Sequence, residues 1–208
     1  MHPNPAFRTK NDALNLQFAR ERGFGVLAVN GAEGPMLSHV PYLLTGDGGR
    51  ADVHLVRSNP IARAVKDATP AVIAVSGGHS YISPDWYEIE DQVPTWNYVA
   101  VHLRGMLVPL PSDALEPLID DLSAEFEARL LPKAPWLSDK MTDGLKARMM
   151  RQIVPFRLDI ASLDGTWKLG QNKPDSARLA AAKAVADAGV GQDLAWLSAL
   201  METPPVLD

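Results

Sequence analysis

Three short apolar runs follow one another between residues 24 and 56, and each of the first two is closed by a turn signal. They are residues 24–30, ended by Asn30-Gly31, residues 35–44, ended by the glycine-rich stretch 45–49, and residues 51–56. Short apolar runs separated by Asn-Gly or glycine-rich turns are typical of neighbouring antiparallel strands. The sequence therefore predicts an antiparallel meander in this part of the chain.

Other elements surround the meander without a regular alternation of strand and helix. Amphipathic or capped segments predict helices at residues 11–22, 60–68, 112–130, 141–153 and 175–188, and apolar runs predict strands at 71–75, 98–107 and 154–163. Groups of strands with helices inserted between them favour a mainly β, α+β barrel over a parallel sheet. We expect residues 1–175 to form the barrel domain and residues 176–208 to form a C-terminal helical extension packed on it.

Composition narrows the possible functions. The chain has no cysteine, which excludes disulfides, thiolate nucleophiles and cysteine-ligated metal clusters. Its formal net charge of −5 disfavours DNA binding by the bulk surface. The sequence lacks the glycine-rich motifs that bind dinucleotides and nucleoside triphosphates, and it lacks the H-E-x-x-H and G-x-S-x-G motifs of common hydrolases. The polar N-terminal ten residues contain no apolar run of the signal-peptide kind, and no membrane-length apolar stretch occurs, so we expect a cytoplasmic protein.

One segment has the pattern of an anion site. Arg57, Ser58 and Asn59 join a strand end to a helix beginning at Pro60, with Arg63 in its first turn. Free backbone N–H groups at a helix start favour an anion, and an arginine there is otherwise opposed by the helix dipole. The same residues also fit a plain helix cap with two solvated arginines. The spacing leaves both interpretations open.

Two further segments carry polar and aromatic side chains. Residues 79–97 form a long aromatic stretch, whose planar side chains and neighbouring Ser, Thr and Asn donors suit a flat heterocycle but equally suit a hydrophobic cluster or a subunit interface. In residues 167–174, Lys168, Gln171 and Asn172 supply cationic and amide groups without a local carboxylate, although a solvated polar turn explains them equally. Histidines 39, 54, 79 and 102 match no metal-ligand spacing, so we expect no metal site.

Five motifs resemble, in order, the PaiB family of flavin-binding negative transcriptional regulators. They are Ser38-His39-Val40-Pro41, His54-Leu55-Val56-Arg57-Ser58-Asn59-Pro60, Tyr81-Ile82-Ser83-Pro84-Asp85-Trp86-Tyr87, Val93-Pro94-Thr95-Trp96-Asn97-Tyr98 and Lys168-Leu169-Gly170-Gln171-Asn172-Lys173. The resemblance covers most of residues 1–175. The tryptophan-rich pair of motifs is long and unusual, which makes chance agreement improbable.

The resemblance implies a split β-barrel that binds FMN non-covalently in clefts between the subunits of a homodimer. It places Ser38, His39 and Val40 beside the isoalloxazine ring and Arg57, Ser58, Asn59 and Arg63 around the phosphate. The cleft is lined by Tyr81, Ser83, Trp96 and Asn97 and closed by Lys168, Gln171 and Asn172. Gly170 stands where the family's motif has a serine, so one hydroxyl contact is absent.

Two classes of function share this expected pocket, and the catalytic residues are unknown. The resemblance implies a negative regulator of transcription that acts directly on nucleic acid or indirectly through a small molecule, and the negative charge does not support direct DNA binding. The alternative is a flavin-dependent oxidoreductase or flavin reductase, in which Lys168 or His39 supplies a cation near the ring. Haem binding is a third alternative for a split barrel.

Overall fold

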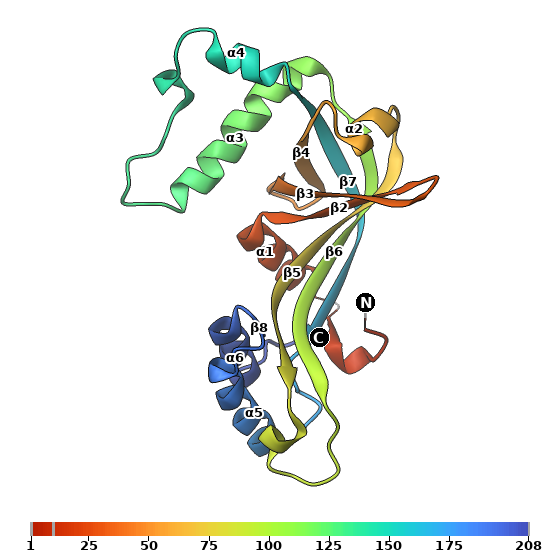
Figure 1. The fold of residues 1–208 in the computed structure, drawn as a ribbon, viewed down its shortest axis with the longest axis vertical. Helices are drawn as coiled ribbons and strands as arrows, with labels where there is room; N and C mark the ends of the chain where they lie inside the picture. The colour runs from red at the N-terminus through yellow and green to blue at the C-terminus, as the bar shows by residue number, and fades with distance from the viewer. Residues whose placement is uncertain (1, 10, 208) are drawn as a thin grey trace. The chain divides into compact units, whose positions relative to one another are not determined.

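A computed structural model describes residues 2–9 and 11–207 of the chain. Figure 1 shows its helices and strands. The helices are α1 (Asp12–Arg22), α2 (Pro60–Ala64), α3 (Leu115–Ala128), α4 (Leu145–Met150), α5 (Asp175–Asp187) and α6 (Leu194–Glu202). The strands are β1 (Arg8–Thr9), β2 (Phe24–Gly31), β3 (Gly34–Leu44), β4 (Arg50–Val56), β5 (Thr69–Ile82), β6 (Thr95–Pro109), β7 (Ile153–Lys168) and β8 (Gly191–Gln192). Short 3₁₀ turns are η1 (Pro5–Phe7), η2 (Pro84–Tyr87), η3 (Ser112–Ala114) and η4 (Ser138–Lys140).

The strands form an antiparallel sheet whose neighbours run β1-β7-β4-β3-β2-β5-β6. An additional pairing between β6 and β7 turns the path from β7 to β6 into a ring. The meander predicted from residues 24–56 is present, because β2 pairs antiparallel with β3 and β3 with β4. This ring, with helices inserted along it, confirms the predicted α+β barrel.

The chain divides into two compact units, and we describe each by itself. The central unit comprises residues 19–74 and 103–162, and the terminal unit comprises the described residues of 1–18, 75–102 and 163–208. Strands β5, β6 and β7 contribute residues to both units. No helix within residues 2–9 and 11–207 has the length and hydropathy needed to cross a membrane.

Alternate side chains of the strands build the core of the central unit. Leu27 of β2, Val53 of β4 and Ile73 of β5 are completely buried, as their period-2 spacing requires. The Tyr42 hydroxyl donates to the Ala19 carbonyl over 2.6 Å, and burial raises the pKa of this phenol. Helix α3 contacts β3 and β4, and Figure 1 shows α3 and α4 on that side of the strands.

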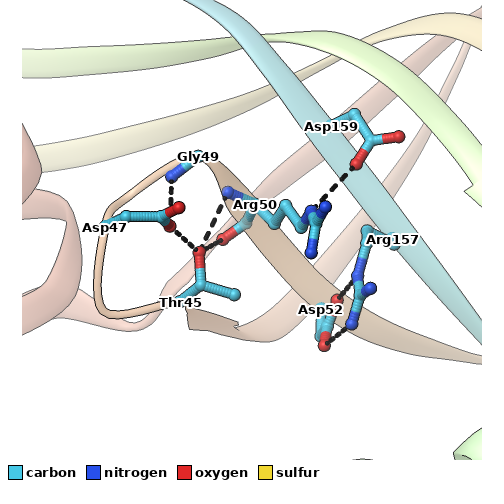
Figure 2. Close-up of polar contacts among 7 residues, drawn as sticks. All are labelled: Thr45, Asp47, Gly49, Arg50, Asp52, Arg157 and Asp159. Carbon is cyan, nitrogen blue, oxygen red and sulfur yellow. Dashed lines mark hydrogen bonds and ion pairs between the residues drawn. The ribbon is translucent and has the colours of Figure 1, made fainter.

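Polar contacts fix the register at the turn between β3 and β4 (Figure 2). The Asp47 carboxylate accepts from the Thr45 hydroxyl at 2.6 Å and from the Gly49 amide at 3.0 Å, which closes the turn and lowers the pKa of Asp47. Across the β4–β7 ladder, the Arg157 guanidinium donates two hydrogen bonds, of 2.6 and 2.7 Å, to the Asp52 carboxylate. These contacts hold β4 between β3 and β7.

The terminal unit has its own core. The Trp167 indole donates to Asn15 over 3.1 Å and meets the ring of Phe18 edge-on. Helices α5 and α6 pack against each other, with the Ser198 hydroxyl donating to the Ala182 carbonyl over 2.8 Å (Figure 1). The structure adds α6, which follows the helix predicted for residues 175–188 and ends before Pro204-Pro205.

Several element boundaries differ from those expected. The strand predicted for residues 71–75 continues to Ile82, because Gly77 and Gly78 stay extended instead of forming a turn. A Cβ atom on Gly77 would lie 3.0 Å from the ring of Phe18, so these glycines allow close packing. The helix predicted for residues 141–153 is confined to α4, since Gly144 has a φ of +75° and β7 begins at Ile153.

Candidate functional site

A basic hollow of about 380 Å³ lies at α2 in the central unit. Arg57, Arg63 and Lys66 line it together with apolar residues of β6 and β7, and no carboxylate of residues 2–9 or 11–207 lines it. None of the three cations forms an ion pair with a described residue. A hollow with three unneutralised cations attracts an anion, and an arginine guanidinium is well suited to a phosphate.

Hydrogen bonds between segments far apart in the sequence position this hollow. Asn59 caps α2 by accepting from the Ile61 amide at 2.9 Å, and its own amide donates to the Ser38 hydroxyl over 3.1 Å. The Arg57 guanidinium donates to the carbonyls of Arg151 and Ile153 over 3.1 and 3.4 Å. The structure therefore brings Ser38 of β3 to the start of α2.

Helix α2 is shorter than the predicted helix over residues 60–68. It has only five residues, and Arg63 lies in its last turn instead of its first. A helix of this length has a weak dipole, and a cation in the last turn is favourable. The expected opposition between Arg63 and the helix dipole is therefore wrong, and the positive potential of the hollow comes from side-chain charges.

The other site residues predicted in the central unit differ in their exposure to solvent. Ser58 is exposed, and His39 is exposed beside the ring of Phe24, with the ring centroids 6.4 Å apart. The Val40 side chain is 2% exposed and points into the core, so only its backbone is available to a ligand. Lys66 was missed by the sequence reasoning, although its position three residues after Arg63 is a helical spacing that points to one face.

An aromatic face marks the terminal unit. The Tyr81 ring meets those of Trp86 and Trp96 edge-on, each at 6.4 Å between centroids, and His79 lies 5.8 Å from Trp96. Trp96 is 45% exposed, and with His79 and Tyr98 it lines a shallow hollow of about 250 Å³. An indole this exposed offers a flat apolar surface on which a planar ring can stack. Ser83 lies half-buried at the start of η2.

Lys168 is a half-buried cation beside this face. Its ammonium group donates to the Thr95 hydroxyl and, over 2.9 Å, to the Trp96 carbonyl. Burial, together with the positive charge of Lys173, lowers the pKa of Lys168. The residue ends β7 and does not belong to the turn in which the sequence placed it. No described carboxylate pairs with it, so its charge is available to an anionic group near Trp96.

The remaining predicted site residues of the terminal unit, Asn97, Gln171 and Asn172, differ in burial and in their hydrogen bonds to the rest of the chain. Asn97 is 1% exposed; its amide nitrogen lies 3.5 Å from the Met201 sulfur, and its oxygen has no partner among the described residues. Gln171 accepts from the Leu169 amide and donates to the carbonyls of Trp167 and Ala6, which closes its turn. Asn172 is exposed.

The predicted site residues thus fall into one group on each unit. Ser38, His39, Val40, Arg57, Ser58, Asn59 and Arg63 belong to the central unit, and Tyr81, Ser83, Trp96, Asn97, Lys168, Gln171 and Asn172 belong to the terminal unit. In the central unit, Asn59 is hydrogen-bonded to Ser38, and Arg57 and Arg63 line the same hollow. In the terminal unit, the Tyr81 ring contacts that of Trp96, and Lys168 donates to the Trp96 carbonyl. The assignment of these residues to a cofactor stays a prediction.

Comparison with known proteins identifies the family. A family model described as "Putative FMN-binding domain" matches residues 1–162. The chain belongs to this family. It is 28% identical over 179 residues to protease synthase and sporulation protein PAI 2 of Bacillus subtilis, covering 82% of both chains. An uncharacterised protein of Aspergillus fumigatus is 23% identical over 209 residues, covering 76% of this chain and 80% of that protein. The resemblance to the PaiB family is confirmed.

Solved structures share the fold of this family member. An FAD- and haem-binding protein from Mycobacterium smegmatis superposes with a TM-score of 0.53 at 14% identity, covering 77% of this chain and 72% of that one. A conserved hypothetical protein from Mycobacterium tuberculosis gives a TM-score of 0.54 at 13% identity, covering 84% and 94% of the two chains. These similarities confirm the split-barrel prediction.

The cofactor of the family is FMN, and residues of both units have the chemistry that FMN requires. Its phosphate is an anion, and the hollow at Arg57, Arg63 and Lys66 is cationic and free of carboxylates. Its isoalloxazine ring is flat, and Trp96 presents an exposed indole. The orphaned oxygen of Asn97 is too deeply buried to be a direct ligand in this conformation.

Proposed function

We propose that the hollow lined by Arg57, Arg63 and Lys66 binds the phosphate of FMN. The observation that supports this proposal is the clustering of three cations around one hollow, without a carboxylate among the described residues that line it. Ser58, which follows Arg57 in the chain, is exposed, and the Asn59–Ser38 bond holds β3 against the start of α2. Arg63 has no hydrogen-bond partner for its side chain among the described residues, so its guanidinium is available to a ligand.

We further propose that the aromatic face of the terminal unit, taken by itself, is a stacking surface for a flat ring such as isoalloxazine. Trp96 and Tyr81 provide the stacking surfaces, and Lys168 provides a cation beside them. A cation close to a flavin ring stabilises negative charge on it. FMN is held in clefts between the subunits of a homodimer in this proposal, which the family resemblance supports.

The biological role that we propose is negative regulation of transcription from the cytoplasm, through a small molecule instead of direct operator binding. The family resemblance supports the regulatory role, and the relative in Bacillus subtilis is named for protease synthesis and sporulation. The formal net charge of −5 opposes strong contact with DNA phosphates. Protein–DNA mixtures at physiological salt should accordingly show no sequence-specific gel shift.

Titrations with FMN and riboflavin test the phosphate site, because the two ligands differ only by the phosphate. The wild-type protein should bind FMN more tightly than riboflavin, as measured by quenching of flavin fluorescence. Arg63→Ala should weaken FMN binding roughly 10- to 100-fold, since a charge-assisted hydrogen bond contributes about 1.5–3 kcal/mol. It should leave riboflavin binding unchanged.

Arg50→Ala is the matched control, because Arg50 is an exposed arginine of the central unit whose partner is Asp159, at 3.6 Å. It should bind both flavins like the wild type. Arg63 is a cleaner probe than Arg57, whose guanidinium also holds two backbone carbonyls. Equal affinity of the wild type for FMN and riboflavin, or equal losses for both ligands in Arg63→Ala, would show that the phosphate binds elsewhere.

A further inference from the structure

A second hollow adjoins the basic hollow within the central unit. Its volume is about 730 Å³, which is within the usual range of small-molecule sites. Residues of α3, of α4 and of the first part of β7 line it. The residues that line both hollows are Arg57, Leu110, Val154 and Pro155. A ligand with one group in the basic hollow therefore has room to continue into the second hollow.

Arg57 lies where the two hollows meet, and hydrogen bonds fix its position. Its guanidinium donates to the Arg151 carbonyl over 3.1 Å and to the Ile153 carbonyl over 3.4 Å. Its backbone amide donates to the Gln152 carbonyl over 2.7 Å. An arginine guanidinium carries five N–H donors, so these bonds leave donors free for a ligand. The free donors are available to a group in either hollow.

The second hollow contains a further unpaired arginine. Arg151 caps the C-terminal end of α4 and lines the hollow, and its side chain is exposed. This side chain has no hydrogen bond or ion pair with a residue of 2–9 or 11–207. Because the Arg151 carbonyl holds the Arg57 guanidinium, the two arginines are neighbours. Two adjacent unpaired guanidinium groups suit a second phosphate next to the first.

The rest of the second hollow has the chemistry that a nucleoside requires. Lys146 lies 2.9 Å from Glu116 and 2.9 Å from Asp120, so the one carboxylate that lines this hollow among the described residues, Glu116, has a counter-ion. The Glu116 carboxylate and the Ser112 hydroxyl can form hydrogen bonds with sugar hydroxyls or a base amino group. Met150 adds a flexible apolar side chain against which a flat base can pack.

We propose that the second hollow binds the adenylate half of FAD, whose flavin phosphate lies in the basic hollow. The inference rests on the proposed function, which places the phosphate of FMN beside Arg57 and Arg63. FAD differs from FMN by an AMP group joined to that phosphate, so the added group begins where the two hollows meet. Its second phosphate lies between Arg57 and Arg151. The chain therefore binds FMN, and it binds FAD more tightly.

The position beside the flavin phosphate favours FAD over a separate nucleotide. A hydride donor such as a reduced nicotinamide dinucleotide has to reach the flavin ring and not the phosphate. Free AMP carries a phosphate of about −1.5 to −2 charge at pH 7, which the phosphate of bound FMN repels. In FAD the two phosphates share a bridging oxygen and carry less charge, and the link makes the second contact intramolecular.

Isothermal titration calorimetry with FMN and FAD tests the proposal on the full chain. The wild type should bind FAD at least about tenfold more tightly than FMN, as one added charge-assisted contact predicts. Arg151→Ala should weaken FAD binding roughly 10- to 100-fold. The same variant should leave FMN binding unchanged, because the backbone carbonyl of residue 151 still holds Arg57.

Two variants of α4 locate the adenylate group. Arg148→Ala is the matched control, because Arg148 is an exposed arginine three residues before Arg151 that does not line the second hollow. It should bind both ligands like the wild type. Ala147 is exposed and lines the second hollow but not the basic one, so Ala147→Phe should weaken FAD binding and leave FMN binding unchanged. Circular dichroism checks the fold of each variant.

Arg63→Ala separates this inference from the proposed function. It should weaken FMN and FAD alike, and unchanged FMN affinity would overturn both proposals. If FMN binding depends on Arg63, three results overturn the inference alone. They are FAD affinity no higher than that of FMN in the wild type, FAD affinity unchanged in Arg151→Ala, and AMP that binds the FMN complex as tightly as FAD binds the free protein. The last result would assign the second hollow to a free nucleotide.

Discussion

At the scale of single residues, His54 links stability to pH. Burial lowers its pKa in the folded protein, so the folded state favours the neutral ring. The unfolded chain takes up a proton near the ordinary pKa of about 6.5. The unfolded state therefore binds more protons as the pH falls through and below that value, and the free energy of unfolding decreases. Above about pH 7 His54 contributes no pH dependence.

We expect the urea midpoint of the wild type to fall more between pH 7.5 and pH 5.5 than that of His54→Phe. Acidic groups with lowered pKa values, such as Asp47 and Glu127, also lose stabilisation in acid, but they are present in both proteins and cancel in the comparison. Identical pH profiles for the two proteins would show that His54 is solvated in the folded state.

The backbone conformation of Gly170 explains why glycine stands where the family's motif has a serine. Its departure from the family's serine suggested a lost hydroxyl contact. In the structure its φ is +81°, a conformation in which a side chain costs about 1–2 kcal/mol. A Cβ atom would lie 3.6 Å from both Arg178 and Asn97, so space is not the constraint. The turn that Gln171 closes therefore favours glycine here for a backbone reason.

At the scale of elements, two ion pairs bridge β4 and β7 at neighbouring positions (Figure 2). Asp52 and Arg157 form a bidentate pair with side chains 17% and 30% exposed, whereas Arg50 and Asp159 are more than half exposed and 3.6 Å apart. We expect Asp52→Asn to lower the free energy of unfolding by about 1–2 kcal/mol and Asp159→Asn by less than about 0.5 kcal/mol. Urea denaturation measures both, and equal losses would contradict this ranking.

The type of most elements could be predicted from local patterns, but the lengths of several elements could not. The strands predicted from the apolar runs at residues 24–30, 35–44 and 51–56 were correct to within one residue. Strand β5 extends beyond its predicted end through Gly77 and Gly78, where an added Cβ atom would lie 3.0 Å from Phe18 and from Asp193 respectively. Such packing contacts join residues far apart in the sequence, and no local pattern reports them.

At the scale of the whole molecule, the FMN family resemblance predicts a homodimer with one FMN per chain. Sedimentation velocity should give a particle of twice the 22.6 kDa chain mass, and absorbance of the same sample should give two flavins per particle. A monomer that retains FMN would contradict the proposal of clefts between subunits. A dimer that carries no flavin after incubation with FMN would contradict the cofactor assignment to this chain.

The sequence by itself determined the family, the cofactor and the mainly antiparallel fold, because spaced motifs and strand periodicity are local properties of the chain. It also singled out Arg57 and Arg63, but only the tertiary structure added Lys66 to them, shortened α2 to five residues and joined Asn59 to Ser38. The burial of Asn97 and the unpartnered nitrogen of His54 are likewise tertiary results. Burial and hydrogen-bond partners depend on which distant segments pack together, and this packing is a property of the folded chain.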